Sequence, residues 1–107
     1  MNIHTHEVDF KNFESVVDSN DYVILDFWAG WCGPCKIFAP VFEALAQAHP
    51  EIYFGKVNTE DAQDLAAAFQ VRSIPTIIVF KKAELVFEHA GLLAPADFES
   101  LIQKLKE

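Results

Sequence analysis

The sequence holds few of the features on which several classes of protein depend. Only two of its 107 residues are cysteine, whereas small secreted domains usually carry several, spread out to cross-link distant segments. The sequence has eight basic and sixteen acidic residues, and the resulting net charge of -8 argues against nucleic acid and anionic membranes as partners. No apolar run approaches the roughly 20 residues of a membrane span. The first roughly 30 residues lack a basic start followed by an apolar stretch, so we expect a cytoplasmic protein.

What the sequence does contain is typical of one compact domain. A chain of 107 residues suits a single domain over 1–107, and 51% hydrophobic residues are enough to bury a core. The ten phenylalanines are explained more simply as core residues than as functional rings. We also expect a monomer.

Hydrophobic periodicity predicts strands and helices in alternation. The expected strands are 3–8, 22–29, 52–58, 76–81 and 85–90, and the second of these has the nearly continuous apolar run of a central parallel strand. The expected helices are one from about residue 10, with Asp9 as a candidate N-cap, then 34–49, 61–69 and one from 95. Alternation followed by a hairpin predicts an α/β fold, with a central mixed five-stranded sheet flanked by four helices.

The two cysteines lie three positions apart, where the predicted central strand gives way to a helix. A disulfide across so short a loop stabilises a fold only weakly, because loop-closure entropy predicts a stabilisation of roughly 2 kcal/mol, against about 4.7 kcal/mol for a 100-residue loop. At a helix start, however, Cys32 and Cys35 are close enough to bond, and the positive end of the helix dipole favours the thiolate of Cys32. Cys35, one turn deeper, should be less exposed and is suited to attack a mixed disulfide held on Cys32.

Two other interpretations of the cysteine pair stay open. Zinc needs four ligands, so two cysteines would require two histidines, and nothing in the sequence places His4 or His6 near Cys32. The other alternative is an inert buried pair. We favour redox chemistry, for which we expect neither a metal nor an organic cofactor.

One stretch around the cysteines resembles the active-site stretch of the thioredoxin family: it is Phe27-Trp28-Ala29-Gly30-Trp31-Cys32-Gly33-Pro34-Cys35-Lys36. Similar to the family pattern as well are Asp26, Pro40, Ile74-Pro75-Thr76 and Gly91, and the likeness extends over most of the chain. Gly-Pro between the cysteines resembles thioredoxins, whereas protein disulfide isomerases usually have Gly-His and glutaredoxins Pro-Tyr. The resemblance implies a thioredoxin fold, reduction of disulfides in protein substrates, and recycling by a thioredoxin reductase.

Asp26 is the only charged residue within the predicted central strand. Burial of a carboxylate without partners is costly, so its pKa should rise; the alternative is an Asp near a strand end that reaches water. The resemblance implies that Asp26 accepts and donates the proton of Cys35, directly or through water. Lys56 either lies beside Asp26 and tunes it, or is a solvated lysine at a strand end.

The resemblance also implies a substrate-binding face beside the cysteines. Sequence alone favours a trans bond before Pro75, whereas the family implies a cis bond packed against the cysteine pair. The backbone of Ile74 would then pair with an extended substrate segment. A flat apolar rim would be completed by Trp31, Gly33, Pro34, Ala90 and Gly91.

Three features lie outside this pattern. The hairpin turn is Lys81-Lys82-Ala83-Glu84, where the family commonly has Asn-Gly, so a positive φ is less comfortable and the turn type stays open. His49 and His89 are expected on the surface.

Two rival functions also stay open: an oxidase or isomerase outside the cytoplasm, and an interaction subunit that uses the same surface whatever its redox state.

Overall fold

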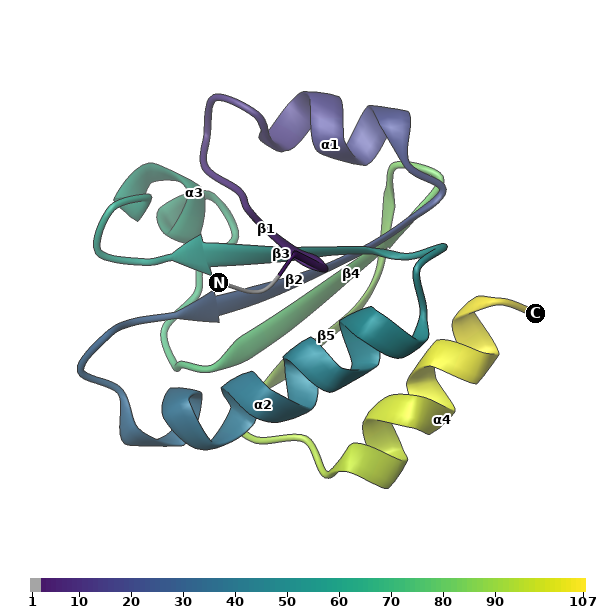
Figure 1. Ribbon diagram of the computed structural model, residues 1–107. Helices are drawn as coiled ribbons and strands as arrows, with labels where there is room; N and C mark the ends of the chain where they lie inside the picture. Colours follow the sequence, from purple (N-terminus) through teal and green to yellow (C-terminus); the bar gives the residue numbers. More distant parts are fainter. Residues whose placement is uncertain (1–2) are drawn as a thin grey trace.

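The computed structural model describes residues 3–107, and its elements follow the predicted order (Figure 1). The strands are β1 (Thr5–Glu7), β2 (Tyr22–Trp28), β3 (Tyr53–Asn58), β4 (Thr76–Lys81) and β5 (Glu84–Ala90). The helices are α1 (Phe13–Ser19), α2 (Gly33–Ala48), α3 (Gln63–Ala68) and α4 (Pro95–Leu105). Over these residues the predicted mixed five-stranded sheet with four helices is confirmed. None of the helices in 3–107 combines the length and the apolar character that crossing a membrane requires.

The sheet has the strand order β1-β3-β2-β4-β5 and is mixed. β1 and β2 run parallel to β3, whereas β4 runs antiparallel to β2, and β5 to β4. Figure 1 shows α1 and α3 on one face and α2 and α4 on the other. β2 is therefore covered on both faces, and its residues from Val23 to Phe27 are all buried, as expected for a central strand.

Alternate residues of β2 divide the core into two layers. Leu25 and Phe27 belong to the cluster that includes residues of α1 and α3. Ile24 belongs to the opposite cluster, together with residues of α2 and α4. Asp26 and Trp28 share the face of Ile24, because side chains alternate along a strand. The charged residue of β2 thus lies on the face that α2 covers.

One buried stripe holds α2 on the sheet. It consists of Cys35, Phe38, Phe42 and Ala46, at the spacing of one helical face. Phe38 stacks on Phe98 of α4, with ring centres 5.7 Å apart. Because Cys35 is the first member of this stripe, the packing of the core also places the reactive end of the helix.

The first helix begins later than predicted. α1 starts at Phe13 with Asn12 as its N-cap residue, and Phe10 lies outside the helix with 60% of its surface exposed. Asp9 does not cap the helix: its Oδ1 accepts hydrogen bonds from the backbone N–H groups of Lys11 and Asn12, at 2.9 and 3.2 Å. Together with the bond from the N–H of Phe13 to the carbonyl of Asp9, these bonds close a turn over residues 10–12, and the helix follows directly after it.

His49, expected on the surface, is buried at the end of α2. Its Nε2 lies 3.1 Å from Oε1 of Glu99, and its Nδ1 lies 3.0 Å from Nζ of Lys106. Lys106 also forms an ion pair with Glu51. Glu99 and Lys106 come from α4 and the chain just beyond it, more than 40 residues away, so no local pattern around His49 predicts its burial.

The β4–β5 hairpin closes with the two-residue turn Lys82-Ala83, between the paired residues Lys81 and Glu84. The φ angles of Lys82 and Ala83 are 51° and 67°. Two successive positive φ angles in a two-residue hairpin are typical of a type I′ turn. The turn therefore adopts the conformation that Asn-Gly favours, at a cost of about 1–2 kcal/mol for each residue with a Cβ.

Replacing Ala83→Gly should stabilise the protein by about 0.5–1 kcal/mol. Glycine removes the Cβ clash of the left-handed region, and this gain exceeds the extra entropy of glycine in the unfolded chain. Equilibrium unfolding in urea measures the change. Ala44→Gly, in the interior of α2, is the matched control and should lower stability by about 1 kcal/mol. Equal losses in the two variants would contradict the turn type.

Candidate active site

The two cysteines are joined by a disulfide at the N-terminus of α2, with their Cα atoms 5.2 Å apart. Cys32 is the N-cap residue, and its Sγ accepts a hydrogen bond of 3.1 Å from the backbone N–H of Cys35. The helix N-terminus thus directs an N–H group and the positive end of its dipole at this sulfur, which favours a thiolate after reduction. The predicted pairing of the cysteines at a helix start is confirmed. Over residues 3–107, no group of three or more His, Cys, Asp or Glu side chains is placed to hold a metal ion.

The expectation that Cys35 is the less exposed cysteine is wrong. Cys32 is 3% exposed and Cys35 is 5% exposed. Sequence spacing places Cys35 deeper in the helix, but Cys32 is covered by a segment 42 positions away, where the carbonyl oxygen of Ile74 lies 3.7 Å from its Sγ. Both sulfurs are therefore sheltered when the disulfide is formed.

The segment that covers Cys32 contains a cis peptide bond between Ile74 and Pro75, which confirms the bond type that the family resemblance implied. The backbone N–H of Gly91 donates a 2.8 Å hydrogen bond to the carbonyl of Pro75. The hydroxyl of Thr76 donates to the carbonyl of Ser73. These bonds tie the loop to the end of β5 and to the start of β4, so its backbone has a defined position against the disulfide.

Asp26 is 1% exposed in the centre of β2, so the interpretation of a strand-end Asp that reaches water is wrong. Its Oδ1 has no hydrogen-bond partner among the described residues. Burial raises the pKa of Asp26 from its ordinary value of 3.8 to about 7, and the attraction of Lys56 opposes this rise. The predicted upward shift is confirmed, and its cause is the loss of water around the carboxylate.

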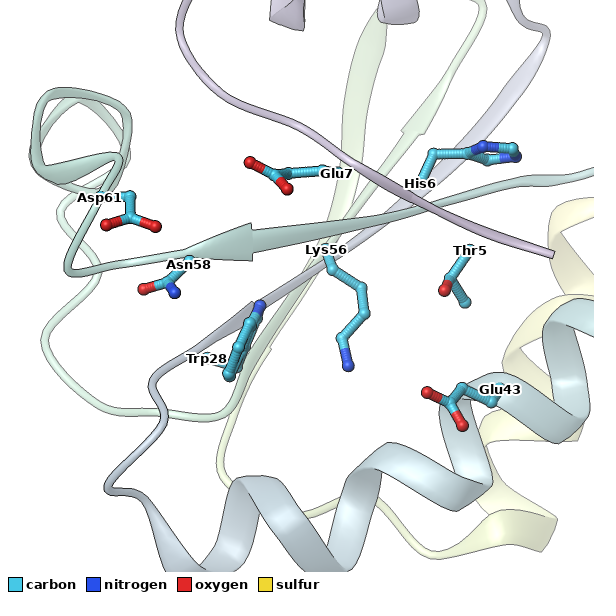
Figure 2. Close-up of a pocket in the computed structure, with 8 residues that line it drawn as sticks. All are labelled: Thr5, His6, Glu7, Trp28, Glu43, Lys56, Asn58 and Asp61. Carbon is cyan, nitrogen blue, oxygen red and sulfur yellow. The ribbon is translucent and has the colours of Figure 1, made fainter. Parts of the chain in front are cut away.

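Lys56 lies beside Asp26, as its Cα partner in the register of β2 and β3. In Figure 2 its side chain extends from β3 towards α2, between Trp28 and Glu43. Its Nζ lies 5.0 Å from the centre of the Trp28 ring. A pocket of about 340 Å³ opens here, and a smaller one of about 120 Å³ shares Trp28 and Lys56 with it and reaches Cys35. Solvent-sized space thus lies between Lys56 and Cys35.

The predicted rim residues surround the disulfide with different exposures. Trp31 is 71% exposed, and Gly33 and Pro34 beside it are exposed as well. Ile74, which packs against the cysteine pair, is half-buried, and Pro75 after it is buried. Ala90 is exposed opposite Thr76, and Gly91 follows with a φ of 97°, in the region that favours glycine.

One exposed apolar residue next to this rim was not predicted. Ile37 is 68% exposed and lies three positions after Pro34 on the outer surface of α2. Residues at this spacing are neighbours on a helix, so Ile37 extends the apolar surface of the rim. The signal in the sequence is its position, since Ile37 falls outside the stripe of Cys35 and Phe38 that faces the core.

Comparisons with known proteins agree with this site. The Thioredoxin family model matches residues 4–107. The chain is 43% identical over 103 residues to a putative thioredoxin 2 of Streptomyces coelicolor, covering 96% of this chain and 77% of that protein. It is 38% identical to a thioredoxin of Haemophilus influenzae, covering 95% and 94%. Among solved structures, a mutant thioredoxin from Halobacterium salinarum NRC-1 has a TM-score of 0.90 at 35% identity, covering 96% and 91%.

The mixed sheet, the disulfide at the start of α2 and the cis-proline loop define a thiol–disulfide oxidoreductase with a thioredoxin fold. The chain belongs to the thioredoxin family. Its activity is the reduction of protein disulfides by dithiol–disulfide exchange, with Cys32 and Cys35 as the redox-active pair.

Replacing Asp26→Asn should stabilise the oxidised protein most at alkaline pH. Because the folded pKa of about 7 lies above the ordinary 3.8, the folded state binds more protons between these values, and stability falls as pH rises through this range. The loss is complete above about pH 7 and amounts to about 4 kcal/mol. Urea unfolding from pH 4 to pH 8 should show the variant gaining by about this amount at pH 8 and little at pH 4. Asp18→Asn, at an exposed site, is the control, and equal pH profiles for parent and Asp26→Asn would refute the assignment.

Proposed function

We propose that the chain is a monomeric, cytoplasmic reductant of protein disulfides, which a thioredoxin reductase returns to the dithiol state. The observation that carries the proposal is the position of the Cys32–Cys35 disulfide, at the helix N-terminus and against the backbone of Ile74. A partner of the reductase class is supported by a structural relative, thioredoxin f2 in complex with ferredoxin:thioredoxin reductase. The match has a TM-score of 0.88 at 28% identity and covers 100% of both chains.

The first step is an attack by Cys32 on the target's disulfide. The thiolate of Cys32 bonds to one sulfur of the target, the target's S–S bond breaks, and the other sulfur leaves as a thiolate. The N–H of Cys35 and the N-terminus of α2 stabilise the attacking sulfur before the step. The product is a mixed disulfide between Cys32 and the target.

The second step is an attack by Cys35 on the Sγ of Cys32. Asp26 accepts the thiol proton of Cys35, the Cys32–Cys35 bond forms, and the second target sulfur leaves as a thiolate. A pKa of about 7 suits Asp26 to this role, because both of its protonation states are populated near neutral pH. The space lined by Trp28, Lys56 and Cys35 supports a route through water, and the charge of Lys56 tunes the carboxylate. Two electrons pass to the target, and the sulfurs need no metal or organic cofactor.

Substrate binding is assigned to the cis-proline loop and the rim. Ile74 lies outside the ladder of β4, and no hydrogen bond within 3–107 uses its N–H. This donor is therefore available to pair with an extended target segment, as in strand addition. Around it, Trp31, Gly33, Pro34, Pro75, Ala90 and Gly91 supply an apolar surface of low sequence specificity.

Cys32→Ser should abolish the reduction of insulin by dithiothreitol, whereas Cys35→Ser should accumulate a mixed disulfide. The first variant lacks the attacking sulfur, and the second lacks the sulfur that resolves the intermediate. Mass spectrometry and non-reducing gels detect the trapped adduct. The double variant is the control for binding without exchange. Unchanged turnover in Cys32→Ser would contradict the roles assigned to the two cysteines. Retained function in the double variant would favour the interaction subunit.

Asp26→Asn should slow the second step and leave the first nearly unchanged. An amide does not accept the proton of Cys35, so release of the reduced target should fall by at least about tenfold at pH 7. Stopped-flow measurements with a preformed mixed disulfide on Cys32 isolate this step. Alkylation of Cys32 in the reduced variant reports the first step separately. A uniform loss in both rates would argue against a proton-transfer role.

A further inference from the structure

A cavity of about 240 Å³ adjoins the proposed substrate-binding face. One wall is the loop 69–73, which leads to the cis-proline, and the other is the end of β5 at 88–90. Ala90 belongs both to this cavity and to the rim, and Ser73 directly precedes Ile74. A target segment that pairs with Ile74 and continues along the loop therefore passes over this cavity.

The loop that forms the first wall is anchored at both ends. After α3, Gln70 has a φ of 55°, and the N–H groups of Gln70 and Val71 donate to the carbonyls of Ala67 and Ala66, both at 3.0 Å. This arrangement is a Schellman motif, with Val71 packed against the core. At the other end, the Thr76 hydroxyl holds the carbonyl of Ser73. The residue between these anchors, Arg72, is thus carried by a backbone segment that is fixed on either side.

Arg72 is the only arginine of the sequence, in a chain of net charge -8. It lines the cavity and is exposed, and over residues 3–107 neither a salt bridge nor a hydrogen bond involves its side chain. Glu88 lines the same cavity without pairing with it. A guanidinium presents a planar set of donors that matches a carboxylate, so its best partner is an acidic side chain brought by another molecule.

We propose that this cavity is a subsite for an acidic side chain of the target, and that Arg72 favours targets with Asp or Glu near the reactive cysteine. The inference rests on the proposed function, since Ile74 must first align the target. The Sγ of Cys32 lies 3.7 Å from the carbonyl oxygen of Ile74, and Arg72 stands two residues before Ile74. An extended chain advances about 3.3 Å per residue, so a target side chain two or three residues from the cysteine comes level with Arg72.

The test measures the rate constants for reduction of disulfide peptides that differ at one position. The peptides carry Asp, Asn or Lys two or three residues from the cysteine, on either side. The prereduced parent should favour Asp over Asn by about fivefold, the upper range for an exposed ion pair. Arg72→Gln should bring this ratio to about one, and Arg72→Glu should invert it in favour of Lys. Glu88→Gln removes a negative charge that repels the Asp of the peptide, so it should raise the ratio of the Asp to the Asn rate constants. About 0.5 M salt should lower this ratio, because salt screens the attraction of Arg72.

Two controls separate the subsite from the chemistry. Lys82→Gln makes the same change of charge in the hairpin turn, at the opposite end of β4 from the site, and should leave the ratio unchanged. Uncharged 2,2′-dipyridyl disulfide reports the reactivity of Cys32 and should react equally fast with every variant. An Asp-to-Asn ratio that Arg72→Gln leaves intact would overturn the proposal, as would a preference of the parent for Lys, which would assign the cavity to Glu88 and basic targets. Loss of reaction with every disulfide, the uncharged one included, would instead contradict the proposed function.

Discussion

The seating of α2 on the sheet is the constraint on which the site depends. The buried face of this helix begins with Cys35 and continues with Phe38 and Phe42, so the residues that hold the helix and the residue that reacts belong to one stripe. Full burial of a phenylalanine contributes about 1.5–3 kcal/mol, and these rings also contact Phe98 of α4. The packing of the core therefore fixes the position of the helix N-terminus, and with it the positions of the two sulfurs.

The same packing also removes Asp26 from water. Because α2 covers the face of β2 that carries Asp26, the carboxylate loses its water and gains no hydrogen bond at Oδ1 from the residues that the structure describes. Burial raises the pKa of Asp26 because it destabilises the ionised state of the carboxylate. The core thus contains a carboxyl group that changes protonation state near neutral pH, which is the property that its proposed role requires. Lys56, one strand away, moderates the cost, since its attraction acts against the desolvation.

The features predicted correctly from the residues are those with local causes. The apolar run of β2, the stripe of α2 and the break between them are visible within short windows, and together they place the cysteine pair at a helix start. The cis bond at Pro75 has no local signal, and only the likeness to the thioredoxin family indicated it. The shelter of Cys32 and the burial of His49 each depend on segments more than 40 residues away, which periodicity does not reveal.

Recognition of targets divides into two parts with different physical origins. In the proposed function, the chemistry at Cys32 is the same for any disulfide, and pairing at the backbone of Ile74 would accept any extended segment, so neither would distinguish one target from another. Discrimination must therefore come from side chains at the margin of the face. An acidic chain repels acidic targets within a Debye length of about 8 Å, and Arg72 is a cation that stands within reach of the same face. In the proposed subsite this guanidinium would offset the general repulsion locally, so targets with an acidic side chain at that position would be favoured over otherwise equal targets without one.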